Sequence, residues 1–558
     1  MKKKFLSILL AGVTLTSMVL TGCGSAASNQ TEAAKEEAAA PESSKEAASE
    51  STGAEGTESS APDFSEHMDI SIAHWDIESQ FAERESDPLY QYICDKFNIS
   101  IEPVNTTWDD YVQKIQMWGA AGSMPDIVSI DAVGTSTYYN WIEQGVVRPL
   151  LNIDEAKYPN LAEYFKTEDI AAMADENGQF YAVPRRMFPT VDWSALDRVV
   201  AYRWDLAQEA GITKEPETWD EFEEMLAAIV EADPEGQNVI GITASNVKMI
   251  GGLFWLYSNP VATSDGSGSD FKWIKENGQY VPAVFSSNAL ASLENMRDMY
   301  KKGIIDPDLA LTNVNSAYDK FVAGNCAAIL MGGGFTNYAN NLYEQRWKDL
   351  YPDKEFTECV KVLKPLKNAN GDYAHAIFKT YWSETYFSSN VDDAKMERIM
   401  ALYDFLISKE GRELVTYGFE GEDYTKNGDE YTIITENIGA KYCTKGIFSE
   451  LVAYNNYECY DMSSPIIVDK KIRQEACDYI DWVLKNTTVP KYYPELTMLK
   501  TETKTNFAVM DHDDLLNIMM GTDDVASMWD SLLSQYEAQG LSQMIEEVNA
   551  AAATMNLD

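Results

Sequence analysis

Basic residues are scarce in this sequence of 558 residues. It contains 44 Lys and Arg against 89 Asp and Glu, which gives a formal net charge of −45. Binding to the phosphates of nucleic acids, or to anionic lipid head groups, requires clustered Lys and Arg side chains. The composition therefore excludes a general nucleic-acid-binding protein and a basic protein of the membrane surface.

Long apolar runs are also missing from the middle of the chain. A membrane-spanning helix needs about 20 consecutive, predominantly apolar residues, and no internal stretch reaches that length, so a polytopic membrane protein is excluded. Hydrophobic residues nonetheless make up 45% of the chain and aromatic residues 11%, which is enough for buried cores. At roughly 100–200 residues per domain, the length predicts several domains or one large body with two lobes.

The motifs of common enzymes and metal sites are absent too. The four histidines lack the HExxH spacing of zinc enzymes, and the chain contains neither a GxSxG elbow nor a P-loop. Six cysteines follow Cys23 without any CxxC pair, so they can form disulfides or stay as buried thiols. Whether the chain contains a pair of glycosidase carboxylates is left open. Such a pair is defined by the distance between its two carboxyl groups, which the sequence does not give.

What the chain does contain begins with an export signal. Three lysines at residues 2–4 precede an apolar stretch at residues 5–20, which is typical of a secretory signal peptide. Residues 20–23, LTGC, resemble the lipobox of bacterial lipoproteins. This resemblance implies that residues 1–22 are a signal peptide and that Cys23 carries a lipid anchor. A cleaved signal followed by an unmodified cysteine is the alternative.

Residues 23–66 form a segment of low complexity after the signal. It consists mainly of Ala, Ser, Glu, Thr, Gly and Lys, and Phe64 is its only aromatic residue. Such a segment cannot bury enough apolar surface to offset the loss of chain entropy on folding. We therefore predict a disordered, acidic tether that holds a folded body at the extracellular face of a bacterial cell membrane.

Strands and helices alternate at the start of the folded part. Apolar runs at 70–73, 99–104 and 126–130 predict strands, and helical spacing at 87–97 and 108–121 predicts helices between them. This order predicts an α/β fold with a parallel sheet and helices on its faces.

Six motifs follow one another along the chain. They are GSMPDIV at 122–128, GVVRPL at 145–150, NGQFYAVP at 177–184, the run at 202–222 that contains PETWDEF, MYKKGIIDP at 299–307 and FVAGNCAA at 321–328. In this order they resemble the motifs of family 1 bacterial extracellular solute-binding proteins, the receptors of carbohydrate ABC importers. Ala182 stands where the third motif more commonly has Gly. YGFEGEDY at 417–424 resembles the long, oligosaccharide-binding lipoproteins of this family.

The resemblance implies a two-lobed α/β fold of the periplasmic-binding-protein type (type II), with a ligand cleft between lobes joined by hinge crossings. By resemblance, lobe 1 comprises residues 67–183 and 333–378, and lobe 2 comprises residues 186–327 and 388–558. The implied protein is a monomer that binds a carbohydrate, an oligosaccharide by preference, and delivers it to ABC transporter permease subunits. No catalysis, cofactor or nucleic-acid partner is expected. The alternatives are a surface enzyme that processes glycans and a receptor for a non-sugar solute such as a peptide.

Aromatic residues near strand ends and chain crossings are the candidate ligand contacts. The chain has 13 Trp and 31 Tyr, and sugars present apolar C–H faces that stack on flat rings and hydroxyl groups that bind polar side chains. The aromatic candidates are Trp75, Tyr138, Trp193, Trp255, Phe335, Tyr381 and Trp382. The polar candidates are Asp76, Asp131, Arg185, Asn337 and Glu384. Core packing is the alternative for each ring, and it is the prediction for Trp108, Trp118, Trp141 and Trp219, which lie in helical patterns.

The position of three candidates follows from the sheet itself. Ligands of open α/β sheets bind beyond the carboxyl ends of the strands. Trp75 and Asp76 follow the first predicted strand, and Asp131 follows the third. We therefore expect these three side chains to meet on one rim.

One departure from the family concerns calcium. Long members often carry an acidic calcium-type loop, and the matching stretch at residues 233–241 reads DPEGQNVIG. Its closing acidic residues are missing, and a hard cation needs about six to eight oxygen ligands. We therefore predict that no metal ion binds there.

Replacement of the lipobox cysteine tests the anchor. Cys23→Ala removes the thiol that accepts the lipid, so the variant should move from the membrane fraction to the soluble fraction on cell fractionation. A variant that stays in detergent-resistant membranes would show that the lipobox interpretation is wrong.

Overall fold

The computed structural model describes residues 64–557, apart from gaps at residues 235, 250, 254–271, 369–370, 374, 376–377, 429, 436, 455–456, 465, 490, 492, 508–511 and 556. The predicted signal peptide, Cys23, almost all of the predicted tether and Trp255 lie outside the described residues. Among the helices that are described, none is both long and apolar enough to span a membrane.

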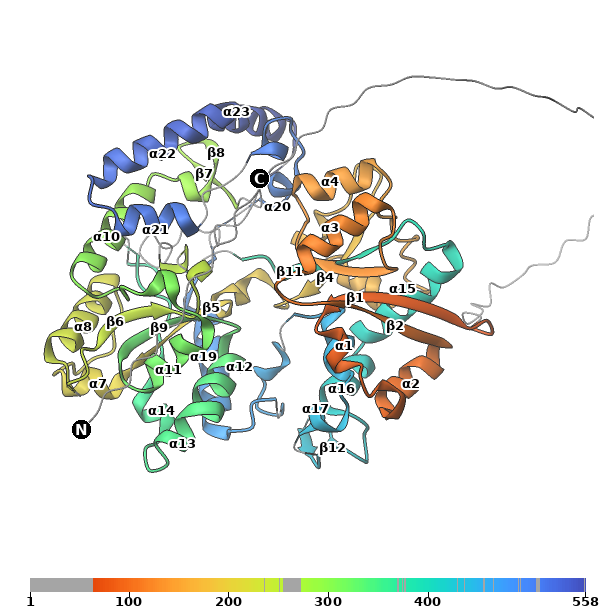
Figure 1. Cartoon of the computed structure of the whole chain (residues 1–558), viewed down its shortest axis with the longest axis horizontal. Helices are drawn as coiled ribbons and strands as arrows, with labels where there is room; N and C mark the ends of the chain where they lie inside the picture. Colours follow the sequence, from red (N-terminus) through yellow and green to blue (C-terminus); the bar gives the residue numbers. More distant parts are fainter. Residues whose placement is uncertain are drawn as a thin grey trace, which may run out of the picture. The chain divides into compact units, whose positions relative to one another are not determined.

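A five-stranded sheet forms the first half of the fold (Figure 1), in the order β2-β1-β3-β11-β4. The strands are β1 (Met68–Trp75), β2 (Ile99–Thr106), β3 (Ile127–Ile130), β4 (Ala182–Arg186) and β11 (Tyr381–Phe387). β1 pairs in parallel with β2 and β3, which confirms the predicted parallel core. β11 runs antiparallel between β3 and β4, so a strand from far along the chain completes the sheet.

The helices beside this sheet come from two distant parts of the chain. They are α2 (Pro88–Phe97), α3 (Tyr111–Ala121), α4 (Ser136–Glu143), α15 (Asp393–Ile407), α16 (Lys409–Tyr417) and α18 (Lys445–Glu450). Asp87 begins α2 by accepting an N–H bond from Leu89 at 2.9 Å, and Pro88 takes the first helical position. Ile93 of α2 and Met396 of α15 are buried in the same core. Figure 1 shows the orange and blue-green helices on this one sheet.

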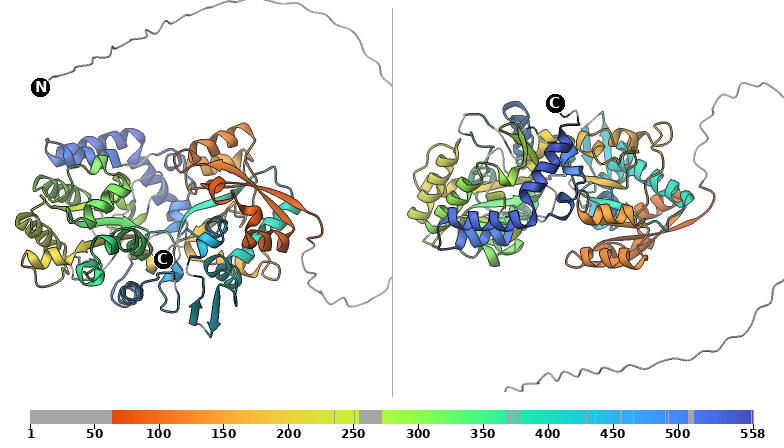
Figure 2. Two further views of the ribbon diagram at one scale, coloured as in Figure 1. Left: turned by 60° about the horizontal axis from the view of Figure 1, so that its bottom comes forward. Right: turned by 90° about the horizontal axis from the view of Figure 1, so that it is seen from above.

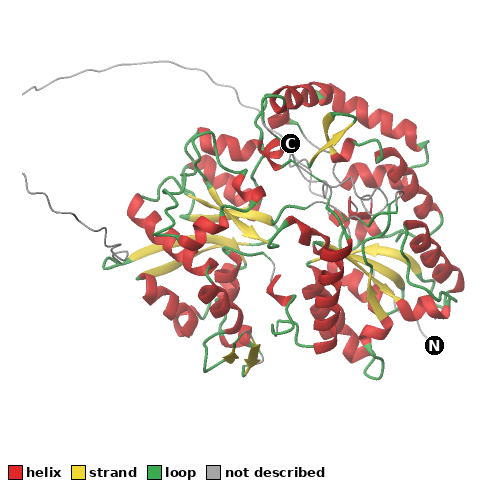
Figure 3. Ribbon diagram, turned by 180° about the vertical axis from the view of Figure 1, so that it is seen from behind, coloured by secondary structure: helices red, strands yellow, loops and turns green. Residues whose placement is uncertain are grey.

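A four-stranded sheet forms the second half, in the order β10-β5-β9-β6. The strands are β5 (Arg198–Arg203), β6 (Ile240–Ala244), β9 (Cys326–Gly332) and β10 (Val360–Val362). β6 and β9 are parallel, and β5 is antiparallel to β9 and β10. Helices surround the strands of both sheets (Figure 3), and each sheet has its own buried core. The predicted two-lobed α/β class is thereby confirmed.

The helices of the second half include α8, whose predicted start at a capping box is confirmed. They are α7 (Trp204–Glu209), α8 (Trp219–Ala232), α10 (Ala289–Lys301), α11 (Val314–Val322), α19 (Lys470–Asn486), α21 (His512–Met520), α22 (Val525–Gln539) and α23 (Leu541–Ala552). Thr218 and Glu221 form a reciprocal capping box at the start of α8. Trp219, Phe222 and Leu226 are buried, as their spacing predicts.

Short elements connect these parts. Two hairpins are β7 (Trp273–Glu276) with β8 (Gln279–Pro282) and β12 (Tyr424–Asn427) with β13 (Glu430–Ile433). The short helices are α1 (Ile77–Gln80), α5 (Pro159–Tyr164), α6 (Glu168–Ala171), α12 (Gly334–Asn337), α13 (Lys348–Leu350), α14 (Phe356–Cys359), α17 (Ile438–Lys441) and α20 (Pro494–Met498).

The packing differs from two of the predicted lobe assignments. The motifs assign residues 333–378 to lobe 1, but Phe335 is buried in a core of the second sheet, and β10 pairs with β5. They assign residues 388–558 to lobe 2, but Tyr403 and Phe448 are buried in the core of the first sheet. The reason is that the chain after β9 stays with the second sheet and reaches the first sheet only at β11.

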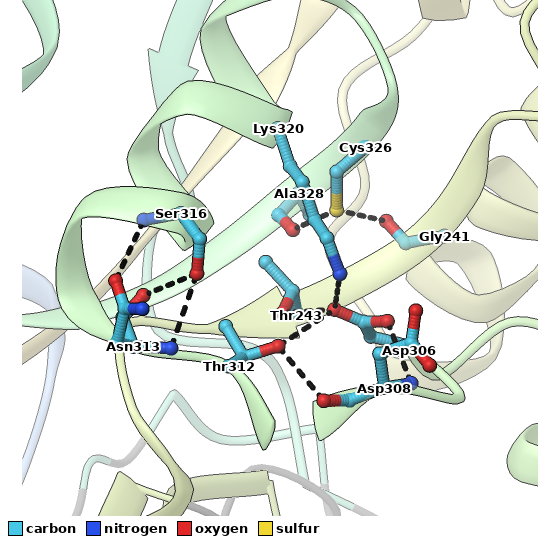
Figure 4. A network of polar contacts seen from close by, with 10 residues as sticks. All are labelled: Gly241, Thr243, Asp306, Asp308, Thr312, Asn313, Ser316, Lys320, Cys326 and Ala328. Atoms are coloured by element: carbon cyan, nitrogen blue, oxygen red, sulfur yellow. Dashed lines mark hydrogen bonds and ion pairs between the residues drawn. The ribbon is translucent and has the colours of Figure 1, made fainter. Parts of the chain in front are cut away.

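The buried carboxylate of Asp306 fixes one edge of the second sheet (Figure 4). Its Oδ2 accepts hydrogen bonds from Thr243 Oγ1 and Lys320 Nζ, both at 2.8 Å, and its Oδ1 accepts the Asp308 N–H at 3.0 Å. Its own N–H donates to the carbonyl of Ile242 at 2.9 Å. One side chain thus joins β6, α11 and the loop after α10.

Asp306→Asn should lower the free energy of unfolding by about 2 kcal/mol, because Lys320 and Thr243 lose a charged acceptor inside the fold. Asp308→Asn is the matched control, since that side chain is exposed, and it should change stability by less than about 0.5 kcal/mol. Chemical denaturation measures both variants. Equal effects would show that the Asp306 network does not stabilise this edge.

Candidate functional site

Five aromatic rings gather where strands of the first sheet end. We call this set the aromatic platform, and its members are Trp75, Trp108, Tyr111, Trp382 and Tyr454. The Trp75 ring lies 5.3 Å from Trp108, 5.2 Å from Tyr111 and 6.0 Å from Trp382, measured between ring centroids. Trp382 lies 4.6 Å from Tyr454. Trp108 is 48% exposed and Tyr454 39%, whereas Trp75 is buried, so the platform has a buried base and an accessible surface.

The buried guanidinium of Arg185 supports the platform from inside. Its central carbon lies 4.6 Å from the ring centroid of Trp75, 5.5 Å from that of Tyr454 and 5.9 Å from that of Trp382. Nη1 donates to Ser383 Oγ at 2.7 Å, and Nη2 donates to Glu450 Oε2 at 3.1 Å. Cation–π attraction and these bonds hold the rings in place.

His74 and Glu450 complete the base of the platform. Burial, and then the Arg185 charge, lower the pKa of His74 to about 3, so the imidazole is neutral at physiological pH. Its Nδ1 donates to the Trp75 carbonyl at 3.0 Å. Burial raises the pKa of Glu450, and the Arg185 charge opposes this rise. His74 is buried, whereas Glu450 is partly exposed and is paired with Arg185.

Asp131 and Glu384 lie beside the platform in different environments. Asp131 follows β3 and is exposed, with Lys379 Nζ at 3.5 Å from its carboxylate. Burial raises the pKa of Tyr111 to about 12, and the Asp131 charge adds to this rise. Glu384 on β11 is fully buried and accepts the Ala132 N–H at 3.1 Å.

The structure brings together four of the predicted ligand residues. Trp75, Arg185 and Trp382 contact one another, and Asp131 lies beside them. Asp76 is exposed directly after β1, and its charge acts on Glu450. β1 and β3 are neighbouring parallel strands, so Asp76 and Asp131, which follow them, lie at the same edge of the sheet; their contact with a ligand stays a prediction.

The other predicted residues lie in different surroundings. Tyr138 is buried against Tyr386, and Phe335 is buried in a core of the second sheet against Tyr338 and Tyr479. The Asn337 amide donates to the Gly332 carbonyl at 2.9 Å, which closes the turn after β9. Tyr381 is buried beneath the Lys379 ammonium, 4.8 Å from its ring centroid. Trp193 lines a separate cavity, 5.8 Å from the Tyr460 ring. Trp255 is outside the described residues.

Sequence reasoning missed three members of the platform. Trp108 is predicted to be core, but it is exposed because it precedes the first turn of α3 and faces the rim. The position of Trp108 and Tyr111 directly after β2, at the carboxyl end of a strand, could have indicated that both belong to the rim. No local pattern indicated Tyr454, which reaches the rim through a bond from its N–H to the Arg186 carbonyl at 2.8 Å. Trp141 and Trp219 are buried, as predicted.

The loop that departs from the calcium pattern is closed by backbone hydrogen bonds. The Asp233 carboxylate accepts N–H bonds from Gln237, Asn238 and Val239 at 3.0–3.2 Å, and these bonds lower its pKa. They occupy oxygens that a cation would need. Among the described residues, no three His, Cys, Asp or Glu side chains are grouped as metal ligands.

Comparison of the sequence with known protein families identifies the family of this chain. The model of the bacterial extracellular solute-binding proteins matches residues 82–413, more than half of the chain. The chain belongs to this family. Such proteins serve ABC transporters as solute-binding components. The resemblance of the sequence motifs is thus confirmed.

Two curated relatives from Bacillus subtilis cover most of the chain. The polygalacturonan/rhamnogalacturonan-binding protein YtcQ is 22% identical over 442 residues, which is 77% of this chain and 81% of the relative. Lipoprotein LipO is 21% identical over 445 residues, which is 76% of this chain and 83% of the relative. These identities are low, so what the relatives bind is not carried over by sequence alone.

Two solved structures have the same fold. The alginate-binding protein AlgQ2, solved without calcium, has a TM-score of 0.64 at 16% identity, with 88% of this chain and 98% of that chain covered. The S. pneumoniae substrate-binding protein FusA, in complex with kestose, also has a TM-score of 0.64 at 16% identity, with 88% and 100% covered. Both similarities establish the two-lobed fold.

The buried Glu384 carboxyl makes stability depend on pH. Burial, and then the Asp131 charge, raise the pKa of Glu384 above its usual range. The folded protein therefore holds this proton more tightly than the unfolded chain, so this contribution to stability falls as pH rises above the ordinary carboxyl value. Glu384→Gln cannot ionise, so its stability relative to the wild type should increase between about pH 5 and about pH 8. Thermal unfolding at several pH values measures this, with the exposed Glu78→Gln as control, and a pH-independent difference would contradict it.

Proposed function

We propose that this protein is a lipid-anchored receptor that captures a carbohydrate, an oligosaccharide by preference, and delivers it to the permease of an ABC importer. The observation that carries the proposal is the aromatic platform at the carboxyl ends of β1 and β2. Half-exposed Trp and Tyr side chains on a rigid sheet offer flat apolar surfaces. The named ligands of similar proteins are polygalacturonan, alginate and kestose, which are all sugars.

The chemistry of the platform suits a chain of sugar rings. Trp108, Trp382 and Tyr454 present rings on which the C–H faces of pyranose or furanose units can stack. The exposed carboxylates of Asp76 and Asp131 accept hydrogen bonds from hydroxyl groups. Several rings side by side favour an oligosaccharide over a single sugar, because one sugar unit covers only one or two of them. Trp255, a candidate from the sequence, remains a proposed contact.

The anchor and the delivery step rest on other observations. The LTGC residues at 20–23 support lipidation of Cys23, and one relative is named a lipoprotein. Family membership supports delivery to a permease, since the family provides the solute-binding components of ABC transporters. We propose that the receptor acts as a monomer, with domain closure around the sugar as the signal to the permease.

Removal of one exposed ring tests the site. Trp382→Ala and Trp108→Ala should each weaken binding of the oligosaccharide found in a glycan screen by about thirtyfold, or about 2 kcal/mol, as for a stacked aromatic anchor. Trp219→Phe is the control, because Trp219 packs against Phe222 in the core of the second half, and it should change stability but not affinity. Calorimetric titration measures all four proteins.

Three results would contradict the proposal. Unchanged affinity in both alanine variants would show that the platform does not bind the sugar. Release of reducing ends from the glycan by the wild-type protein would show that the protein is a glycan-processing enzyme. Binding of peptides but of no glycan in the same screen would favour a receptor for a non-sugar solute.

A further inference from the structure

A second cavity lies apart from the aromatic platform. It has a volume of about 370 Å³, and none of its lining residues belongs to the platform. It is lined by Trp193, Lys409, Arg412, Glu413, Thr416, Tyr417, Tyr431, Tyr457, Glu458, Tyr460, Asp461, Ser463 and Ser464. One wall is α16 and the neighbouring hairpin β12–β13, which Figure 2 shows at the edge of the first half. The other lining residues are Trp193 and residues of the segment 457–464.

Three buried polar atoms of the cavity have no hydrogen-bond partner among the residues that the structure describes. They are Arg412 Nη2, Thr416 Oγ1 and Glu458 Oε2. Arg412 Nε donates to Glu458 Oε1 at 2.8 Å. An arginine and a carboxylate can form two such bonds side by side, but here Arg412 Nη2 and Glu458 Oε2 do not form the second one. Buried polar groups are normally paired with protein atoms, water or a ligand, so these three atoms are candidates for bonds to a molecule in the cavity.

Aromatic rings make up much of the rest of the cavity lining. Trp193 lies 5.8 Å from Tyr460, and Tyr417 lies 4.7 Å from Tyr431. The Tyr417 hydroxyl is bonded to Ser464 Oγ at 3.0 Å, which fixes its ring. The cavity therefore combines flat apolar walls with a donor, an acceptor and a hydroxyl that are unpaired.

The charges of the cavity disfavour an anion. Lys409 and Arg412 face Glu413, Glu458 and Asp461, so the lining carries one more negative charge than positive charges. The Lys426 ammonium, at 2.6 Å, neutralises Glu413 from outside the lining. The balance is close to zero, which suits an uncharged ligand.

We propose that this cavity is a second binding site, for a small neutral sugar or polyol with neighbouring hydroxyl groups. One hydroxyl accepts a hydrogen bond from Arg412 Nη2 and donates one to Glu458 Oε2, and a second hydroxyl pairs with Thr416 Oγ1. The C–H faces of the ligand lie against Trp193 and the tyrosine rings. The volume fits the lower end of ligand pockets, about 300–1,000 Å³. The site is independent of the sugar that the platform binds.

A hydroxyl-to-methyl exchange separates a ligand site from a packing defect. Thr416→Val deletes an unpaired buried hydroxyl, so the free protein should melt at the same temperature or higher. Its affinity for the ligand of this cavity should fall about fivefold, because one hydrogen bond is lost. Trp193→Ala should weaken the same ligand about tenfold or more. Thr357→Val, at a half-buried position outside the cavity, is the matched control.

The probes are D-glucose, D-galactose, sucrose and cellobiose, titrated at millimolar concentration by calorimetry and by ligand-observed NMR on each variant. The expected result is binding of at least one probe that weakens in Thr416→Val and Trp193→Ala and is unchanged in Thr357→Val. The inference is overturned if no probe binds or if every affinity is the same in Thr416→Val, Trp193→Ala and the wild type. Binding of galacturonate or choline alone would also overturn it. Loss of binding only in Trp382→Ala would overturn it as well, while supporting the platform.

Discussion

A buried positive charge holds the candidate site together. Arg185 lies on β4, its nitrogens bond to Ser383 on β11 and to Glu450 at the end of α18, and its guanidinium faces Trp75 at the end of β1. A guanidinium that is removed from water is costly unless it is fully paired. These four segments, which are far apart in the sequence, must therefore assemble together. The exposed rings of the platform are rigid because they stand on this assembly.

The sequence predicts the local parts of this arrangement and not the long-range ones. The order β1-α2-β2-α3-β3, the capping box at Thr218 and the rim position of Trp75 follow from hydrophobic period, helix caps and strand ends, which are properties of neighbouring residues. The insertion of β11 between β3 and β4 depends on pairing between segments far apart, which no local period encodes. The lobe assignment fails for this reason for residues 333–378 and for the part of 388–558 that packs on the first sheet, whereas α19 and α21 to α23 pack with the second sheet as assigned. Tyr454 was missed for the same reason.

An irregularity in β11 explains how adjacent residues serve one site. Side chains of a regular strand alternate between the two faces of the sheet, yet Trp382 and Ser383 both reach Arg185. The pairing of β11 with β4 shifts register between Tyr381 and Glu384, and Ser383 has a positive φ of 55°. Such a bulge redirects a side chain. It also lies in the segment where the chain passes from the second sheet to the first, so a sugar bound at Trp382, as proposed, would touch a chain crossing.

Arg185 and Arg412 differ in how many of their nitrogen donors are paired. Each nitrogen of Arg185 already donates to Glu450 or Ser383, so its role at the platform is to orient rings, and recognition of hydroxyl groups there falls to the exposed Asp76 and Asp131. Arg412 keeps Nη2 unpaired beside the unpaired Glu458 Oε2, an arrangement that a hydroxyl group completes. Arg185, whose nitrogens all donate within the protein, supports a binding surface, whereas Arg412, which keeps one nitrogen unpaired, can itself bind a ligand. If both proposals hold, the platform would select for ring faces and chain length, whereas the cavity would select for the hydroxyl pattern of a single small molecule.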